Sequence, residues 1–370
     1  MLESNILLQL IQNELDEFCA ERRREFADIS DDLFPLIDYA KSLMAGGKRF
    51  RAQFCYWSWV GHLDVNQELT ELQQERSLKA MVSICAALEM FHAAALVHDD
   101  LIDQSDTRRG QPAVHKSFET LHKLSNWSGQ PERFGLAASV LVGDLLLNWS
   151  SEIFGNALQY APTREIELAC RSEFSRMRVE IMAGQYLDVL EENAGALRDA
   201  SEAVARANQV MLYKTAKYSI EAPLLIGAAF AGATVATRAA IEQFAIPLGL
   251  AFQLRDDVLG VFGDPKITGK PAGDDLREGK RTVLIGLTRE ILTGSVRNIF
   301  DEMLAARDLS VDQIAFLQQT IIGAGALKKT EAMIEELGNQ ALENLNNLSL
   351  EISGKSSLVD LAKQVMNRDK

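Results

Sequence analysis

The sequence is poor in cysteine and proline. It has four cysteines and eight prolines in 370 residues. The cysteines stand far apart without a Cys-x-x-Cys pair, which excludes a disulfide-stapled or zinc-ribbon domain. Eight prolines among 24 glycines exclude collagen-like and low-complexity proteins. A chain of this length buries a large core without staples, so we expect buried free thiols in a reducing compartment at Cys19, Cys55, Cys85 and Cys170.

Positive charge is also scarce. The chain has 38 Lys and Arg against 52 Asp and Glu, so its formal net charge is 38 − 52 = −14 at pH 7. Nucleic-acid binding depends on neutralising phosphates with Lys and Arg, so no nucleic-acid partner is expected. An anionic ligand would need locally concentrated basic residues or bound metal cations.

Signals for export and for membrane insertion are missing as well. The N-terminal segment MLESNILLQLIQNELDEF carries acidic residues early and no basic stretch before an apolar core, which predicts an amphipathic helix. The most apolar stretch, Pro223 to Ala236, is shorter than the ~20 residues that span a bilayer. We therefore expect a cytoplasmic protein without a membrane anchor.

Apolar residues recur at three- and four-residue spacing through most of the chain, and period-two runs are scarce. This pattern, without a long linker or an internal repeat, predicts an all-α fold with one large domain over residues 1–370. Helices are expected at residues 4–25, 31–44, 48–62, 77–103, 135–159, 163–187, 198–218, 220–232, 235–260, 280–292, 294–306, 310–323, 325–348 and 356–367.

The most informative segment is EMFHAAALVHDDLIDQSDTRRG, from Glu89 to Gly110. At ~100° per residue, Asp99 and Asp103 lie one turn apart on one helix face, and His92 falls near that face. Two carboxylates on adjacent turns repel unless a cation lies between them, and Mg²⁺ prefers a few carboxylates together with water or phosphate oxygens. A solvated acidic helix end is the alternative for this motif taken alone.

A second segment, FQLRDDVLGVFGDPKITGKPAGDDLREGKRT from Phe252 to Thr282, has the same design. Its helix carries Gln253, Asp256 and Asp257, and basic residues follow at Lys270 and Lys280. Either cluster alone is compatible with ordinary surface polarity. Two such clusters in an antiparallel helical chain predict two walls of one cavity.

Three basic pieces accompany the acidic clusters. Arg108 and Arg109 directly follow the first cluster, where paired guanidiniums beside metal-holding acids suit a diphosphate. GGKRFR (46–51) opens a helix, whose first N–H groups favour an anion, with Lys48 and Arg51 on one face. Lys214-Thr215 lies in an otherwise apolar helix; a lone lysine there could also snorkel to the surface.

In order and spacing these motifs resemble the trans-isoprenyl diphosphate synthases of the polyprenyl synthetase family, most of all bacterial members that make geranylgeranyl diphosphate. The resemblance covers nearly the whole chain. It implies a helical bundle of the isoprenoid synthase type with a central active-site cavity, and a homodimer, for which the Gly/Ala-rich segment 226–233 could serve. It also implies head-to-tail condensation of isopentenyl diphosphate with allylic diphosphates.

The resemblance also implies roles for single residues. About three Mg²⁺ ions per active site, replaceable by Mn²⁺, would be held by the carboxylates of Asp99, Asp103 and Asp256, with Asp100 and Asp257 in support. The allylic diphosphate would contact Arg108, Lys214, Lys270 and Lys280. Isopentenyl diphosphate would contact Lys48, Arg51, His92 and Arg109. Oxygen dipoles facing the carbocation would come from Thr215 and Gln253.

The second motif departs from the family pattern. Gly260 stands at its fifth position, where many members have Asp. Because the resemblance places the third Mg²⁺ chiefly on Asp256, activity is expected to survive. We expect Asp264 to compensate in part through water.

Product length depends on the helix before Asp99. Ala94 and Ala95 leave room for a growing tail, and Phe91 one turn deeper is large enough to form a floor. This predicts a twenty-carbon product, geranylgeranyl diphosphate, with farnesyl diphosphate as a shorter product. If Phe91 only packs against a neighbouring helix, the product is a longer polyprenyl diphosphate.

Two alternatives belong to other classes. A class I terpene cyclase also uses an acidic motif and Mg²⁺, but it needs no second diphosphate site such as GGKRFR and Arg108-Arg109. A non-catalytic partner subunit should have lost its aspartates, whereas both clusters are intact here.

Overall fold

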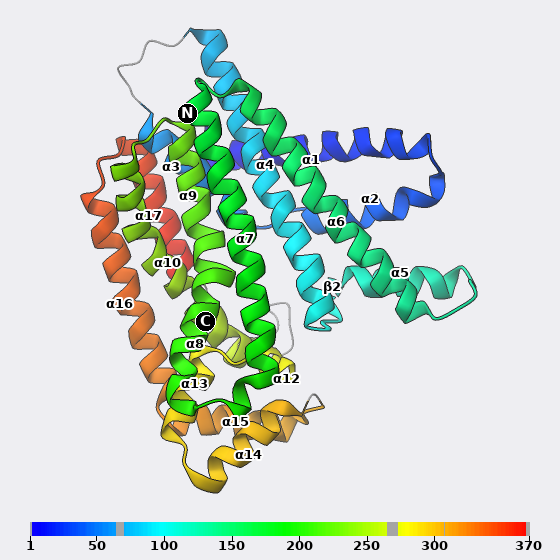
Figure 1. The fold of residues 1–370 in the computed structure, drawn as a ribbon, viewed down its shortest axis with the longest axis vertical. Coiled ribbons are helices and arrows are strands. Elements are labelled where there is room, and N and C mark those ends of the chain that lie inside the picture. The colour runs from blue at the N-terminus through cyan, green and yellow to red at the C-terminus, as the bar shows by residue number, and fades with distance from the viewer. Residues whose placement is uncertain (1, 64–69, 265–272, 307, 368–370) are drawn as a thin grey trace. The chain divides into compact units, whose positions relative to one another are not determined.

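The computed structural model describes residues 2–63, 70–264, 273–306 and 308–367. These residues are almost entirely helical (Figure 1), which confirms the all-α prediction. The strands among them are two residues long each, β1 (Thr107–Arg108) and β2 (Gln111–Pro112), and pair antiparallel.

The chain divides into two compact units. Unit 1 contains Met1–Arg171 and Ile226–Gly232, and unit 2 contains Ser172–Leu225 and Ala233–Lys370. The single domain over residues 1–370 stays a prediction. Two helices contribute residues to both units, α7 (Arg164–Ala194) and α9 (Ala222–Phe230).

Unit 1 is built around α4 (Glu71–Ile102), which begins at a capping box between Thr70 and Gln73. Helix α4 carries small and apolar residues on all its sides, so neighbouring helices bury it. It packs against α3, α6 and α1. Figure 1 shows α4 beside α6, and α5 forming a hairpin with α6. The other helices of this unit are α1 (Ser4–Ala27), η1 (Asp31–Leu33), α2 (Phe34–Met44), α3 (Phe50–His62), α5 (Val114–Leu124), α6 (Pro131–Ala157) and η2 (Leu158–Tyr160).

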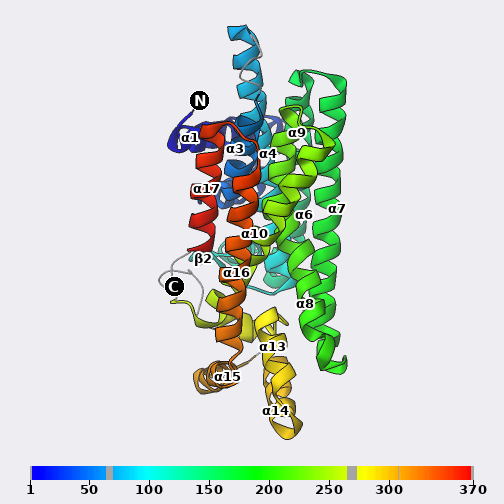
Figure 2. The same ribbon diagram turned by 90° about the vertical axis from the view of Figure 1, so that its left-hand side faces the viewer.

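In unit 2, α10 (Val235–Phe262) packs between the π-helix η5 (Met211–Glu221) and α16 (Ala326–Asn347). Figure 2 shows α10 and α16 side by side. The remaining elements are η3 (Gly195–Leu197), η4 (Ala200–Glu202), α8 (Ala203–Val210), α12 (Asp274–Glu278), α13 (Val283–Ile291), α14 (Gly294–Ala305), α15 (Val311–Gly323) and α17 (Ile352–Met366).

Most expected helices are found within a few residues of their predicted ends. Two were missed, α5 and α12. The four-residue spacing of Val114, Phe118 and His122, which form the buried face of α5, could have revealed the first. Together α5 and α6 form a helical hairpin, with its turn between Leu124 and Pro131.

Burial tests two further expectations. All four cysteines are free and buried, as predicted. The segment 226–233 was expected as a dimer contact, but a Cβ on Gly227 would lie 2.0 Å from the carbonyl oxygen of Cys55, and Ile226 is fully buried. This segment packs against α3 inside unit 1, so the expectation was wrong for most of its length.

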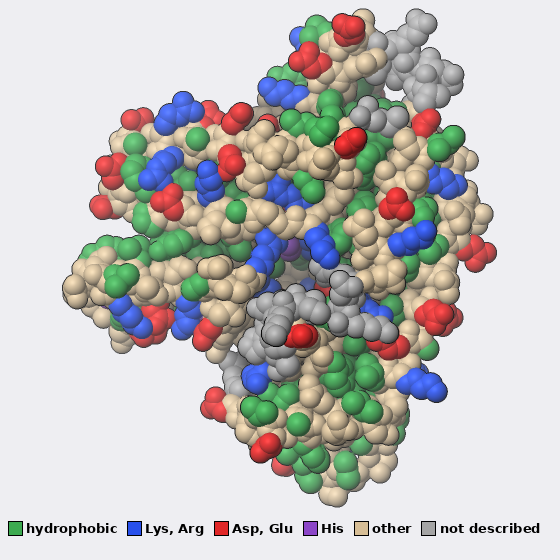
Figure 3. All heavy atoms as spheres, turned by 180° about the vertical axis from the view of Figure 1, so that it is seen from behind, with side chains coloured by type: hydrophobic (Ala, Val, Ile, Leu, Met, Phe, Trp, Pro, Cys, Tyr) green, Lys and Arg blue, Asp and Glu red, His purple; other side chains and the backbone are tan. Residues whose placement is uncertain are grey.

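Within the part of the chain that the structure describes, two helices are long and apolar enough to cross a membrane by length and composition alone, and neither is the stretch singled out from the sequence. In Glu71–Ile102 the apolar window is 83% buried, which is typical of a core helix, and in Pro131–Tyr160 it is 44% buried. Figure 3 shows Lys and Arg side chains interspersed with Asp and Glu on the face drawn, in keeping with the mixed charge of the chain.

Candidate functional site

The acidic end of α4 is arranged around an arginine. Asp103 caps the helix and donates its backbone N–H to the Asp99 carbonyl at 2.8 Å. Arg108 donates from Nε to Asp100 at 2.8 Å and from Nη2 to Asp99 at 3.2 Å. Asp100 is buried, so its carboxylate mainly holds this guanidinium. Arg108 reaches the acids because the chain turns back directly after α4, where Gln104 has φ 56° and the Ser105 N–H donates to the Asp100 carbonyl at 3.0 Å.

The turn between β1 and β2 contains Arg109 and directs it toward the glycine turn before α3. Arg109 has φ 52° and Gly110 has φ 72°, so both are left-handed. The guanidinium of Arg109 lies 3.4 Å from where a Cβ on Gly47 would be, and it donates to the Leu43 carbonyl at 3.5 Å. The predicted motifs GGKRFR and RRG thus meet in unit 1.

Glu89 and His92 of α4, both half-buried, complete a basic cluster with Arg51 and Arg109. Glu89 accepts the backbone N–H of Ala52 at 3.3 Å. Burial raises the pKa of Glu89, and the charges of Arg51, Arg49 and Arg109 oppose this rise. Burial and neighbouring guanidiniums, Arg51 foremost, hold the pKa of His92 well below its usual range. At neutral pH His92 is therefore an uncharged donor among cations.

Lys48 differs from its prediction. The helix α3 begins at Phe50, and Arg49 before it has φ 48°, so Lys48 precedes the helix and shares no helical face with Arg51. Lys48 itself is exposed. Arg49 turns inward instead and donates to the Leu8 carbonyl at 3.3 Å, which anchors the turn to α1.

In unit 2 the predicted pair Lys214-Thr215 lies on the π-helix η5. Lys214 Nζ is 2.5 Å from Asp188 Oδ2 on α7, and Thr215 is half-buried. Sequence reasoning missed Asp188. Asp188 is a single buried acid in the long helix α7. Nothing in the sequence around it distinguishes it from the other acids of that helix.

The two neighbouring aspartates of the second acidic motif, Asp256 and Asp257, differ in burial. Gln253 Nε2 donates to Asp257 Oδ1 at 2.7 Å. Asp257 is buried, and burial raises its pKa well above the usual range. Asp256 is half-buried. Asp257 thus orients Gln253, and Asp256 is the better candidate ligand.

A carboxylate fills the space at Gly260. A Cβ there would lie 1.9 Å from Asp275 Oδ2 and 2.9 Å from Asp275 Oδ1. Lys280 Nζ lies 3.7 Å from Asp275 and 2.6 Å from Glu278. Asp275, which the sequence reasoning did not assign, thus stands where the second motif lacks its acid. Lys270 lies outside the described residues.

The three residues expected to set product length lie along α4. Phe91 and Ala94 are fully buried, and Ala95 is half-buried. Their burial is compatible with a floor below the acidic end of the helix.

The carboxylates fit a hard cation that takes most of its ligands elsewhere. Among the described residues, no three His, Cys, Asp or Glu side chains cluster as a ready-made metal site. Asp99 and Asp103 offer carboxylate oxygens one turn apart on α4. Such sparse oxygen ligation suits Mg²⁺ completed by phosphate or water, and does not suit a closed structural zinc site.

The chain is similar to several known proteins over most of its length. The family model described as polyprenyl synthetase matches residues 35–321. A geranylgeranyl diphosphate synthase of Sulfolobus acidocaldarius is 30% identical over 89% of this chain and 89% of its own length. A geranylfarnesyl diphosphate synthase of Aeropyrum pernix is 31% identical over 68% of this chain and 71% of its own. The crystal structure of geranylgeranyl pyrophosphate synthase from Corynebacterium glutamicum, complexed with isoprenyl diphosphate and magnesium, has TM-score 0.90 and 33% identity with full coverage of both chains.

Proposed function

Because the chain belongs to the polyprenyl synthetase family and is a prenyltransferase of the trans-isoprenyl diphosphate synthase type, we propose that it makes geranylgeranyl diphosphate. The substrates are isopentenyl diphosphate and an allylic diphosphate. The observation that carries the proposal is the arrangement of α4, whose acidic end and basic cluster offer one site for a metal-bound diphosphate and another for a metal-free one.

Asp99, Asp103 and Asp256 are the residues that would hold Mg²⁺. Bound there, the metal would neutralise the charge that develops on a departing diphosphate. Arg108, Lys214 and Lys280 add cationic donors for the same allylic diphosphate, and Lys270 is proposed with them from the sequence alone. Arg108 already balances Asp99 and Asp100, so it is pre-oriented toward the acidic end.

The basic cluster would bind isopentenyl diphosphate directly. Arg51 and Arg109 supply the charge, His92 an uncharged N–H, and exposed Lys48 a further ammonium. Glu89 balances these guanidiniums, because its carboxylate interacts with the charges of Arg51 and Arg109 while accepting the Ala52 N–H.

The reaction follows from these charges. The allylic C–O bond breaks and its electron pair leaves with diphosphate, which the cationic donors stabilise. The double bond of isopentenyl diphosphate attacks the carbocation, and the proton lost from the new cation goes to a diphosphate oxygen. Thr215 and Gln253 would face the cation with oxygen dipoles. The amide NH₂ of Gln253 is engaged by Asp257, which leaves its carbonyl end for the cation.

The length of α4 below Asp99 would set the product. Ala94 and Ala95 admit a tail, and Phe91 would stop it after twenty carbons. The geranylfarnesyl synthases among the relatives make a longer product the second candidate.

Assembly and location are proposed on separate grounds. Exposed apolar side chains line one stretch of α6, at Leu136, Val140 and Leu141, and we place the contact of a homodimer there. The buried free thiols fit a cytoplasmic location.

Chromatography of the products tests the function. The purified protein is incubated with isopentenyl diphosphate, Mg²⁺ and dimethylallyl, geranyl or farnesyl diphosphate in turn, with a chelator in a parallel set. A twenty-carbon diphosphate that requires Mg²⁺ is expected. Consumption of allylic diphosphate to hydrocarbon would instead identify a cyclase, and no turnover would favour a partner subunit.

A further inference from the structure

The helix that carries Lys214 and Thr215 changes its winding at these residues. The π-helix η5 (Met211–Glu221) joins α8 to α9 without a break, and the N–H of Ala222 bonds to the carbonyl of Lys217, five residues earlier. π-Helical winding is rare, is mostly confined to single turns, and is frequent at functional sites. An element of 11 residues therefore needs support from its surroundings.

Two glycines from different helices lie against the backbone of η5 at this point. A Cβ on Gly184 of α7 would lie 2.3 Å from the Lys214 nitrogen and 2.7 Å from its Cα. A Cβ on Gly249 of α10 would lie 2.6 Å from the Ala216 Cα and 3.0 Å from its carbonyl oxygen. Both contacts are with backbone, which has no alternative rotamer, so any larger residue would displace the segment 214–216.

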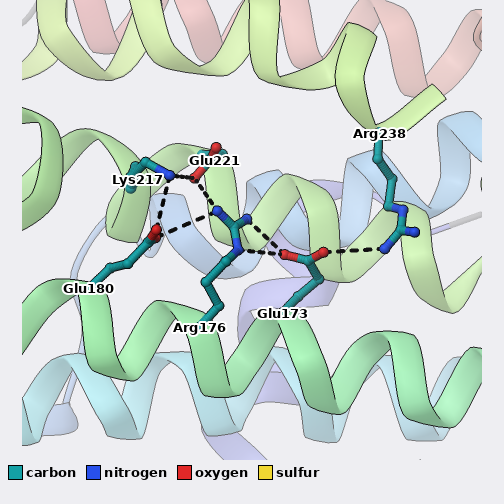
Figure 4. A network of polar contacts seen from close by, with 6 residues as sticks. All are labelled: Glu173, Arg176, Glu180, Lys217, Glu221 and Arg238. Carbon is teal, nitrogen blue, oxygen red and sulfur yellow. Dashed lines mark hydrogen bonds and ion pairs between the residues drawn. The ribbon is translucent and has the colours of Figure 1, made fainter. Parts of the chain in front are cut away.

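An ion network holds the following part of η5 (Figure 4). Lys217 Nζ lies 3.1 Å from Glu180 and 3.4 Å from Glu221, and Arg176 reaches Glu221 at 3.4 Å. Arg176 also contacts Glu173 at 2.7 Å, and Glu173 contacts Arg238 of α10 at 3.2 Å. The network contains three cations and three anions, so its charges balance.

The ion network can form in only one orientation of η5. The side chain of Glu221 is 3% exposed, and a buried carboxylate is stable only with its partners in place. On α7 the supporting residues recur every four positions at Arg176, Glu180, Gly184 and Asp188, so one helix face contacts η5 along its length. Asp188 ends this row on Lys214 itself.

We propose that Gly184, Gly249 and the ion network (Glu173, Arg176, Glu180, Lys217, Glu221 and Arg238) position the π-helix so that Lys214 and Thr215 reach the allylic diphosphate and the cation formed from it. The inference rests on the proposed function and assigns to these residues a role that acts through Lys214 and Thr215. They are positioning residues, because none of them is assigned a contact with substrate.

Steady-state kinetics of Gly184→Ala and Gly249→Ala test the proposal, with Gly155→Ala as the matched control. Gly155 is also a helical glycine, but its Cβ would meet only an Arg171 side-chain atom at an ordinary 3.8 Å. We expect kcat for elongation to fall at least about tenfold in both test variants, since displacements of about 1 Å weaken catalysis strongly. The KM for isopentenyl diphosphate should change less than about twofold, because its proposed site lies in unit 1, on α3, the turn before α3, α4 and the β1–β2 turn. The control should match the unchanged protein.

A double-mutant cycle separates positioning from general destabilisation. If Gly249 acts through Lys214 and Thr215, adding Gly249→Ala to the double variant Lys214→Met/Thr215→Val should lower kcat by less than about twofold, because both groups that it positions are already gone. Wild-type kcat in both glycine variants, or full additivity in the cycle, would overturn the inference. If the glycine variants do not fold, Glu221→Gln tests the proposal instead, because it keeps the shape of the side chain and removes its charge from the ion network. An unchanged kcat would overturn the proposal, whereas a fall of several-fold would support it. Inactive wild-type protein would contradict the proposed function instead.

Discussion

The first acidic motif and the second are built in different ways. On α4, a single helix carries Phe91, His92, Asp99 and Asp103, and a short hairpin adds Arg108. In unit 2, the corresponding groups come from α7, η5, α10 and α12. Similar residue patterns therefore arise once from the spacing along one helix and once from the packing of several. The first arrangement can be read from the chain, and the second depends on close backbone contacts.

The sharpest way to break this comparison is to remove a carboxylate from α4. In Asp99→Asn the charge that faces Arg108 and the proposed metal is lost without a change in volume. We expect kcat to fall by roughly a thousandfold, as for other groups that stabilise developing charge. The control is Asp106→Asn, an exposed acid close by in sequence that contacts Lys116 at 3.3 Å. If Asp99→Asn retained more than a tenth of the activity, the first motif would not be the metal site.

The variant Gly260→Asp tests the second acidic motif. It introduces an acid at the fifth position of the second motif, yet we expect about a tenfold loss of kcat and a higher Mg²⁺ requirement, because the new side chain would displace Asp275 from the space it fills. The measurement is rate against Mg²⁺ concentration, with Gly323→Ala as a glycine control in open space. An increase in activity would show that Asp275 is no substitute for the missing acid.

Asp275 also changes the expectation for Asp264. If Asp275 supplies the missing carboxylate, Asp275→Asn should raise the Mg²⁺ requirement more than Asp264→Asn does. The reverse order would favour compensation by Asp264, as expected from the sequence.

The sequence predicted what local spacing determines. The helices and the Asp99–Asp103 face follow from periodicity. The grouping of Arg51 with Arg109 and His92 was implied by the family resemblance. The sequence did not predict the roles of Asp188 and Asp275, because these acids reach Lys214 and Gly260 from other helices. The left-handed backbone of Arg49, which removes Lys48 from α3, also has no signal in a helical pattern. The π-helical winding of η5 is a property of its packing, since helical periodicity alone gives no indication of it.

Product length tests the role of α4 below the acidic end. Ala94 is fully buried, so Ala94→Phe should shorten the product to fifteen carbons or fewer, provided the tail runs along this face. Phe91→Ala should lengthen it, at a stability cost of about 3–5 kcal/mol for a buried Phe. Product chromatography together with thermal unfolding separates the two effects. Unchanged products in both variants would show that other residues form the floor that limits product length.

The smallest expected effect concerns His92 and pH. Its folded-state pKa lies well below 6.5, so the unfolded chain binds more protons as pH falls below that value. Stability that is present above pH 6.5 is therefore lost as pH falls toward the lowered pKa, by at most about 1.4 kcal/mol per pH unit. His92→Gln keeps an uncharged N–H donor and removes the titration. Its melting temperature should fall less between pH 7.5 and 5.5 than that of the unchanged protein, and its KM for isopentenyl diphosphate should rise only a few-fold. Equal losses in both proteins, or a KM raised as far as in His92→Ala, would show that a charged imidazole binds the diphosphate. The basic cluster on α4 would then resemble the ammonium-based site of η5 more closely than its geometry indicates.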